Sequence, residues 1–328
     1  MSRAAQLTGW TPIRFYWQRA EPCVDWCHMG GVRFTEPFFD QTVERVLRHP
    51  FSLLFRPQTP VAALAEVATH ELCLPPTGFI FHLSRCGSTV VSRMLAALPQ
   101  NVVVSEAGAL DAVLRANFRH PVTDEQRQTW LKWMICALGQ RRDVAARHYF
   151  IKFDGWHALQ LALIRRAYPD VPCLFVYRDP VEVMASQLDR PAGWMMPGDL
   201  HPHVLGVDAQ TVFGLSPAQY RALVLTRICQ SVLQHLRQGP VKLINHRELP
   251  AVLDAALFDF FGIAYTEAEF AVMHRTTQFH AKEPDARYAD DSALKRGAVS
   301  AEARLVTEQW IGPLYEQLEA LREYAHAP

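Results

Sequence analysis

A glycine, Gly87, stands among the polar residues Arg85, Ser88 and Thr89. They follow shortly after the hydrophobic stretch Gly78–Phe81. This pattern predicts a strand, a tight loop and an amphipathic helix that begins at Ser88. The first N–H groups of such a helix have no partner within it, and the helix dipole favours negative charge beside them. The sequence therefore predicts an anion site next to Arg85, with an ordinary strand–turn–helix as the alternative.

A second cation follows a second hydrophobic stretch. Residues 172–177 are expected to form a buried strand, and Arg178 stands at its carboxyl end. Asp179 suits a helix N-cap and Pro180 suits the first helical turn, so a helix should begin here. Ser186 would lie about two turns into that helix. The alternative is an arginine in an exposed turn, followed by an ordinary helical serine.

The first of these segments resembles a loop of the sulfotransferases that use 3′-phosphoadenosine 5′-phosphosulfate, PAPS. The order Arg85-Cys86-Gly87-Ser88-Thr89 resembles their 5′-phosphosulfate loop, usually Lys/Arg-Ser-Gly-Thr-Thr, with Cys86 in the serine position. The nucleoside triphosphate loop instead carries a lysine directly after its last glycine. The resemblance implies a nucleotide-binding P-loop fold with PAPS as the sulfuryl donor and no metal.

Two further segments resemble the part of that family's site that binds the 3′-phosphate. Arg178 and Ser186 match the family in residue type and in their eight-residue spacing. Lys295, Arg296 and Gly297 resemble its late basic-basic-glycine element, which folds over the same phosphate. The resemblance covers roughly residues 76–300, and it implies that these five residues bind the cofactor.

Glu106 is the residue we expect to act as general base. It follows the predicted strand 101–105, so it should project from the same sheet edge as the Arg85 loop. The 21 residues between Arg85 and Glu106 match the spacing in the protein-tyrosine sulfotransferases, in which a glutamate at this strand end is the base. A helix N-cap or a surface carboxylate is the alternative. Lys152, in the predicted strand 149–153, is expected to reach the sulfuryl group or to be a snorkelling edge lysine.

Histidines offer other candidates for the base. The steroid and phenol sulfotransferases use a histidine for which this sequence has no clear counterpart. His157 is the second choice, although a histidine at a helix start is commonly structural. His82 lies inside a predicted strand and is expected to pack in the core.

Val90 marks a departure from the phenol-type enzymes, which place an adenine-stacking tryptophan after the loop. Two other functions stay open. An ATP-dependent P-loop kinase is disfavoured because no Gly-Lys-Ser/Thr accompanies the loop. A non-catalytic nucleotide-binding protein would keep the pocket without turnover.

The composition limits the partners. Lysine plus arginine and aspartate plus glutamate number 33 each, so no overall field favours nucleic acid. No stretch approaches the roughly 18 apolar residues of a membrane span. Seven cysteines are scattered apart from Cys23 and Cys27, which with His28 hint weakly at zinc. We therefore expect a cytoplasmic enzyme with unpaired thiols.

The organisation predicted is α/β, a P-loop NTPase-like parallel sheet flanked by helices. Residues 1–75 should be an N-terminal extension or small subdomain, with a strand at 31–35, and 76–328 the sulfotransferase-like domain with a largely helical C-terminal part. Residues 191–216 are rich in large apolar side chains and are expected to form a lid or a packed loop. We accordingly predict a small-molecule acceptor with apolar or aromatic character, bearing a hydroxyl or amine.

Overall fold

The computed structural model describes residues 7–68, 73–278, 297 and 299–326. Its centre is a five-stranded parallel sheet in the order β5-β6-β4-β7-β8. The strands are β4 (Gly78–His82), β5 (Asn101–Ser105), β6 (His148–Lys152), β7 (Cys173–Tyr177) and β8 (Val241–Asn245). This sheet confirms the predicted α/β architecture, because every strand was expected at these positions to within a residue or so.

The direction of the connections reverses at β4, which lies between β6 and β7. In open parallel sheets, ligands bind beyond the carboxyl ends of the strands at such a reversal. The segments that follow β4, β5, β6 and β7 therefore share one edge of the sheet.

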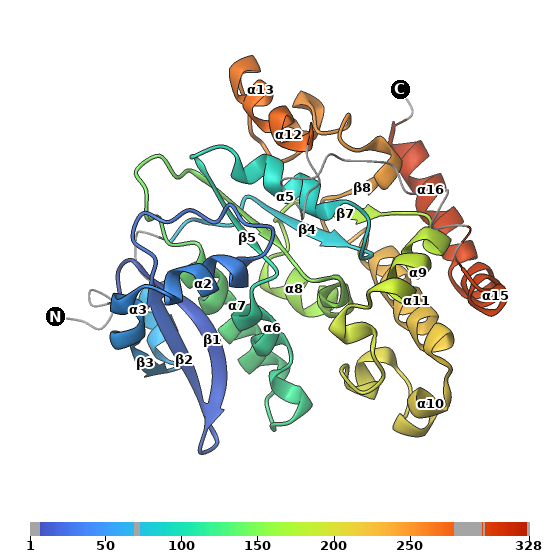
Figure 1. The fold of residues 1–328 in the computed structure, drawn as a ribbon, viewed down its shortest axis with the longest axis horizontal. Coiled ribbons are helices and arrows are strands. Elements are labelled where there is room, and N and C mark those ends of the chain that lie inside the picture. The colour runs from blue at the N-terminus through green and yellow to red at the C-terminus, as the bar shows by residue number, and fades with distance from the viewer. Residues whose placement is uncertain (1–6, 69–72, 279–296, 298, 327–328) are drawn as a thin grey trace.

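Alternation along the strands gives the sheet two apolar faces. Ile80 and Leu174 pack in a cluster with side chains of α5, α12 and α13. Their strand neighbours Phe79 and Phe175 face the opposite side, in the larger cluster that includes side chains of α7, α8 and α11. Figure 1 shows α12 and α13 on one side of the sheet and α6, α7 and α8 on the other. Burial on both faces explains why these strands are continuously hydrophobic.

The helices extend as follows: α2 (Phe39–Leu47), α3 (Pro50–Leu54), α4 (Ala63–Ala68), α5 (Ser88–Ala96), α6 (Gly108–Leu114), α7 (Asp124–Leu138), α8 (Leu161–Ala167), α9 (Pro180–Asp189), α10 (Ala209–Gly214), α11 (Pro217–His235), α12 (Ala255–Phe260), α13 (Glu267–Arg275), α15 (Ala301–Trp310) and α16 (Gly312–His326). Short 3-10 turns include η2 (Gly155–Gln160) and η3 (Gly193–Met195). Helix α6 was not predicted.

The N-terminal region forms an antiparallel sheet of β1 (Trp10–Gln18), β2 (Glu21–His28) and β3 (Gln58–Pro60). The strand predicted at 31–35 is wrong, because those residues form no strand. The hairpin between β1 and β2 turns at Arg19 and Ala20, both with positive φ. Such turns normally carry glycine or asparagine, so no residue pattern indicated this one. β1 packs against α6 and α7.

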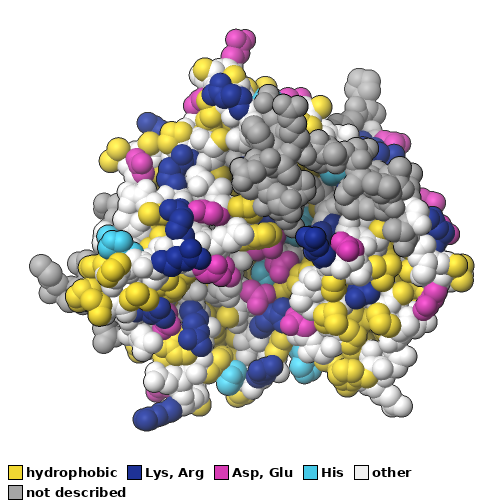
Figure 2. Space-filling view, viewed as in Figure 1, with side chains coloured by type: hydrophobic (Ala, Val, Ile, Leu, Met, Phe, Trp, Pro, Cys, Tyr) yellow, Lys and Arg dark blue, Asp and Glu magenta, His cyan; other side chains and the backbone are white. Residues whose placement is uncertain are grey.

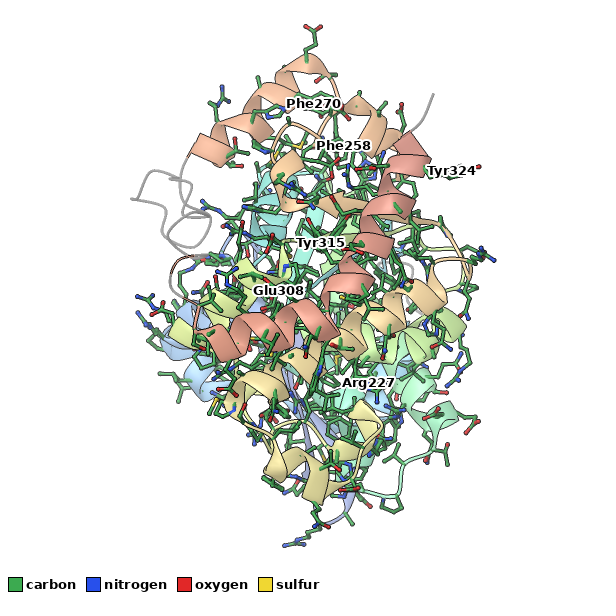
Figure 3. All side chains as sticks on the ribbon, turned by 90° about the vertical axis from the view of Figure 1, so that its right-hand side faces the viewer. Arg227, Phe258, Phe270, Glu308, Tyr315 and Tyr324 are labelled. Carbon is green, nitrogen blue, oxygen red and sulfur yellow. A yellow bond between two sulfur atoms is a disulfide. The ribbon has the colours of Figure 1, made fainter. Side chains whose placement is uncertain are left out.

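The C-terminal helices cover the β8 side of the sheet (Figure 3). Tyr315 on α16 accepts a hydrogen bond from the Asn245 amide at the end of β8, and the Tyr177 hydroxyl bonds the Glu319 carboxylate. Tyr324, further along α16, points away into solvent in Figure 3. These contacts fix α16 against the carboxyl ends of β7 and β8.

One expectation about the cysteines is wrong. Cys73 and Cys136 form a disulfide, with their Cα atoms 5.3 Å apart, which ties the segment before β4 to α7. Cys23, Cys27, Cys86, Cys173 and Cys229 are free and buried. Within the described residues, no helix has the length and apolar character needed to cross a membrane.

Candidate active site

The loop between β4 and α5 has an unusual backbone. Ser84, Arg85 and Gly87 all have positive φ, at 74°, 51° and 88°. Among the described residues, the backbone N–H groups of 85–89 donate to no protein acceptor, and no side chain caps α5. Positive φ in non-glycine residues is costly and clusters at functional sites. The strained loop thus presents a row of N–H donors, as anion sites require.

Packing explains the residues at the centre of this loop. The Cys86 thiol donates to the Val176 carbonyl on β7 at 3.0 Å, which anchors the loop to the sheet. A Cβ at Gly87 would lie 2.8 Å from His246 and from Leu249, so no larger residue fits. Cys86 is fully buried, which makes it a structural thiol.

The Arg85 guanidinium points to the end of α9. It donates to the carbonyl of Arg190 at 2.6 Å, while Gln187 on the same helix donates to the Ser84 hydroxyl at 2.7 Å. These two bonds fasten the loop to α9. Arg85, itself a residue of the loop, remains partly exposed.

Lys152 and Glu106 form the charged centre of the site. Lys152 is the last residue of β6 and has no exposed surface, and its Nζ lies 2.7 Å from Glu106 Oε1. The same Nζ donates to Thr89 Oγ1 at 3.4 Å, in the first turn of α5. Lys152 therefore connects the expected base to the anion loop. The snorkelling alternative is wrong, because the ammonium group is fully buried.

The backbone also holds Glu106 in place. Its φ is 52°, and its N–H donates to the Lys152 carbonyl at 2.7 Å. Within the described part of the chain, Oε2 of Glu106 accepts no hydrogen bond, and the nearest contacts of both Lys152 and His82 are with Oε1. The side chain is 20% exposed. One carboxylate oxygen is thus held and the other is available.

Two partners control the pKa of Glu106. Burial raises it, but the Lys152 charge, together with His82, outweighs burial and holds the pKa well below its usual range. Glu106 is therefore ionised and, while Lys152 stays beside it, only weakly basic.

His82 is buried at the end of β4, beside Glu106. Its Nδ1 accepts a hydrogen bond from the Ser84 N–H at 3.1 Å, and its Nε2 lies 3.3 Å from Glu106 Oε1. That contact is an ion-pair distance without the alignment of a hydrogen bond. Burial lowers the pKa of His82, whereas Cys86 and Glu106 raise it, to about 9.

Asp154 completes the cluster. Its Oδ1 accepts from Gly155 N–H and from the Trp194 indole N–H, at 2.6 and 2.9 Å. Burial and the charge of Glu106 raise its pKa. Ligand atoms of His82, Glu106 and Asp154 lie within 4.8 Å of one another, a grouping found at metal sites. We assign no metal, because the Lys152 ammonium already neutralises the Glu106 carboxylate.

Arg178 lies at the end of β7, as predicted, and is buried. Its Nε donates to Glu182 Oε2 at 2.5 Å, one turn into α9. Ser186 lies one turn further and donates to the Glu182 carbonyl at 3.2 Å. Arg178 is thus paired with the Glu182 carboxylate, and Ser186 with the backbone carbonyl of the same residue. Lys295 and Arg296 lie outside the described residues, and Gly297 is exposed.

His157, the second choice as base, belongs to a separate network. Its Nδ1 accepts from the Asp154 N–H at 3.1 Å, and its Nε2 lies 3.0 Å from Asp111 Oδ1. Trp156 donates to the same oxygen and Arg115 to the other. Both ring nitrogens are engaged and the side chain is buried, so His157 is a structural residue here.

The N-terminal region contributes two residues that the sequence did not suggest. The Phe38 ring lies 5.0 Å from Lys152 Nζ, a cation–π distance, and Asp40 accepts from the Gly108 N–H at 3.4 Å. No motif marks either residue. Figure 2 shows acidic, basic and histidine side chains gathered near the middle of the face that it presents.

The segment 191–216 is short helices rather than an irregular loop. Trp194 and Leu205 are buried in the main core, whereas Met196 and Phe213 are exposed. A Cβ at Gly155 would lie 2.7 Å from the Trp194 ring, so the two residues pack closely. The Trp194 ring therefore packs beside Asp154 and Gly155.

Comparisons with known proteins give distant likenesses. No family model matches the chain, and no curated protein matches it closely. The fold is similar to a sulfotransferase from Alicyclobacillus acidocaldarius, with a TM-score of 0.47 and 18% identity, over 76% of this chain and 96% of that one. It is also similar to sulfotransferase STF9 from Mycobacterium avium, with a TM-score of 0.44 and 13% identity, over 76% and 79% of the two chains. Mouse sulfotransferase SULT7A1, solved with PAP, shows a TM-score of 0.39 and 12% identity, over 78% and 94%.

Proposed function

We propose that this protein is a PAPS-dependent sulfotransferase. The observation that carries the proposal is the position of Lys152, whose Nζ contacts both Glu106 and Thr89 of the anion loop. A base, a cation and a row of backbone donors thereby meet at one edge of the sheet. Sulfuryl transfer needs these groups to accept a proton and to stabilise charge on the leaving phosphate.

The residues divide into two binding regions. The N–H groups of 85–89, with Arg85, would bind the 5′-phosphosulfate, and Arg178 with Ser186 would bind the 3′-phosphate. Lys295, Arg296 and Gly297 are proposed to close over the same phosphate. PAPS supplies the sulfuryl group for transfer.

Glu106 is proposed to take the proton of the acceptor. Its Oε2 is the atom for this role, because Oε1 is held by Lys152. The acceptor is proposed to be a small molecule with a hydroxyl or amine and apolar character, since Trp194 and Met196 lie on the segment beside Asp154.

Ligand binding and isotope transfer test the proposal. Calorimetry should show that adenosine 3′,5′-bisphosphate (PAP) binds more tightly than ATP, with or without magnesium. Transfer from ³⁵S-labelled PAPS to phenols, lipid alcohols, peptides and glycans should then identify the acceptor class. Preference for magnesium-ATP would favour a kinase instead. Tight PAP binding without any transfer would favour a non-catalytic nucleotide-binding protein.

A further inference from the structure

His82 is a buried titratable group that the proposed mechanism does not use. It is the last residue of β4, directly before the anion loop, and its side chain is 6% exposed. Its two ring nitrogens face different partners. Nδ1 faces the Ser84 backbone N–H and Nε2 faces the Glu106 carboxylate.

The Ser84 contact determines where the ring proton lies. A nitrogen that accepts an N–H bond must have a free lone pair, so the proton of the neutral ring is on Nε2. A doubly protonated ring would also carry a proton on Nε2, after losing the Ser84 bond. In both states, therefore, His82 presents an N–H group to Glu106.

Lys152 and His82 compete for the same oxygen atom. Lys152 Nζ lies 2.7 Å from Glu106 Oε1, whereas His82 Nε2 lies at 3.3 Å and is a buried donor without an aligned hydrogen bond. Lys152 thus dominates at rest. Because it already contacts Thr89 Oγ1, a small rotation would turn its ammonium from Glu106 to an anion on the loop.

We propose that His82 is a positioning residue for Glu106, which takes over Oε1 when Lys152 turns to an anion bound at the loop. This inference rests on the proposed function. His82 would then keep the carboxylate in place while its free oxygen, Oε2, faces the acceptor. The departure of Lys152 would also remove a full positive charge from Glu106 and make it a stronger base.

Other groups also face His82. The Cys86 thiol and the Asp154 carboxylate lie near the imidazole, along with Glu106. Asp154 is already engaged by Trp194 and Gly155, and Cys86 by Val176. Glu106 is therefore the neighbour whose partners can change on anion binding.

Substitution of His82 tests the proposal through turnover. His82→Gln retains an amide N–H near the position of Nε2, whereas His82→Leu removes the donor. We expect His82→Leu to lower kcat for ³⁵S transfer from PAPS by about 10- to 100-fold, as loss of a supporting contact commonly does. The Kd for PAP should change by about twofold or less, and His82→Gln should recover most of the turnover. The acid limb of kcat should move to higher pH in His82→Leu, because the charged carboxylate loses a donor.

His157→Leu is the matched control. It removes a second buried imidazole that faces a carboxylate and accepts a backbone N–H. It should lower the melting temperature without moving the acid limb. A normal pH profile in His82→Leu, or the same shift in His157→Leu, would overturn the proposal.

Nitrogen-15 NMR of the histidine rings tests it without an acceptor. Adding PAP should move the His82 Nε2 proton downfield as its bond to Glu106 strengthens, and Glu106→Gln should abolish that movement. A His82 signal that ignores both changes while PAP binds would contradict the inference. Failure of PAP to bind would instead contradict the proposed function. In that case, comparing the His82 signals of the wild type and Glu106→Gln without nucleotide would still test the contact between His82 and Glu106.

Discussion

Glu106 follows β5 directly and Asp111 lies in the next helix, α6, and each faces a buried histidine and a cation. Asp111 has three donor partners: Trp156 and His157 contact Oδ1, and Arg115 contacts Oδ2. Both partners of Glu106 lie nearest to the same oxygen, and among the described residues its second oxygen accepts no hydrogen bond. The residue types are alike, but only Asp111 has donors on both of its oxygens.

This difference distinguishes a structural carboxylate from a reactive one. A carboxylate with donors on both oxygens is held in one orientation, and a substrate cannot easily reach its oxygens. A carboxylate held through a single oxygen keeps its orientation and can still accept a proton. The strained φ of Glu106, at 52°, indicates that the surroundings enforce its position.

The largest expected effect comes from removing the positive charge of Lys152, the main partner of Glu106. Lys152→Met should lower the free energy of unfolding by about 3–5 kcal/mol, because it leaves a largely buried carboxylate without its main partner. Chemical denaturation measures this. The double variant Lys152→Met/Glu106→Gln should lose less than the sum of the two single variants. Additive losses would mean that the two side chains are not coupled.

The next effect concerns chemistry alone. Glu106→Gln keeps the shape of the side chain but removes its basicity, so kcat should fall by about 100-fold or more. The affinity for PAP should change little, because a general base acts mainly in the transition state. Steady-state kinetics with calorimetry separates the two.

Asp111→Asn is the control for that comparison. It should lower the free energy of unfolding by about 1–3 kcal/mol through partners left unsatisfied, and kcat should remain within about threefold. If Asp111→Asn lowered turnover as much as Glu106→Gln, the number of oxygens with donors would not distinguish a structural carboxylate from a reactive one.

A third carboxylate, Glu182, is paired with Arg178, the residue proposed to bind the 3′-phosphate. Arg178 therefore allows the same separation of structural and functional roles to be tested on a cation. Arg178→Ala should weaken PAP binding by about 10- to 150-fold, which corresponds to loss of a charge-assisted contact of about 1.5–3 kcal/mol. Adenosine 5′-phosphate, which has no 3′-phosphate, should be far less affected. Arg190→Ala removes an exposed cation directly after α9 and controls for net charge. Equal losses for both nucleotides would refute the role of Arg178.

The sequence predicted the part of the site that follows from sheet geometry. Arg85, Glu106, Lys152 and Arg178 each lie at or next to the carboxyl end of a strand. Because parallel strands end at a common edge, hydrophobic stretches alone bring these residues to one side. Their chemical roles remain predictions.

The remainder depends on tertiary contacts that no short motif encodes. Phe38 reaches Lys152 from a region with no recognisable pattern, and the partner of each carboxylate oxygen is set by packing. His82 was expected to be a core histidine, which its burial supports. Its second contact, with Glu106, depends on a register between two strands that are not adjacent.

The smallest expected effect, when it is measured over a single pH unit, is the pH dependence of stability that His82 produces. Its pKa in the folded protein is raised from 6.5 to about 9, so its contribution to stability is complete below about pH 6.5 and is lost as the pH rises through 9. The unfolding free energy of the wild type, relative to His82→Gln, should therefore decline across that window, by at most about 1.4 kcal/mol per pH unit. Glu106→Gln should flatten the decline, because the carboxylate charge helps to raise the pKa. A flat difference curve would mean that the Ser84 N–H keeps the ring neutral, and His82 would then hold Glu106 through its Nε2 proton alone.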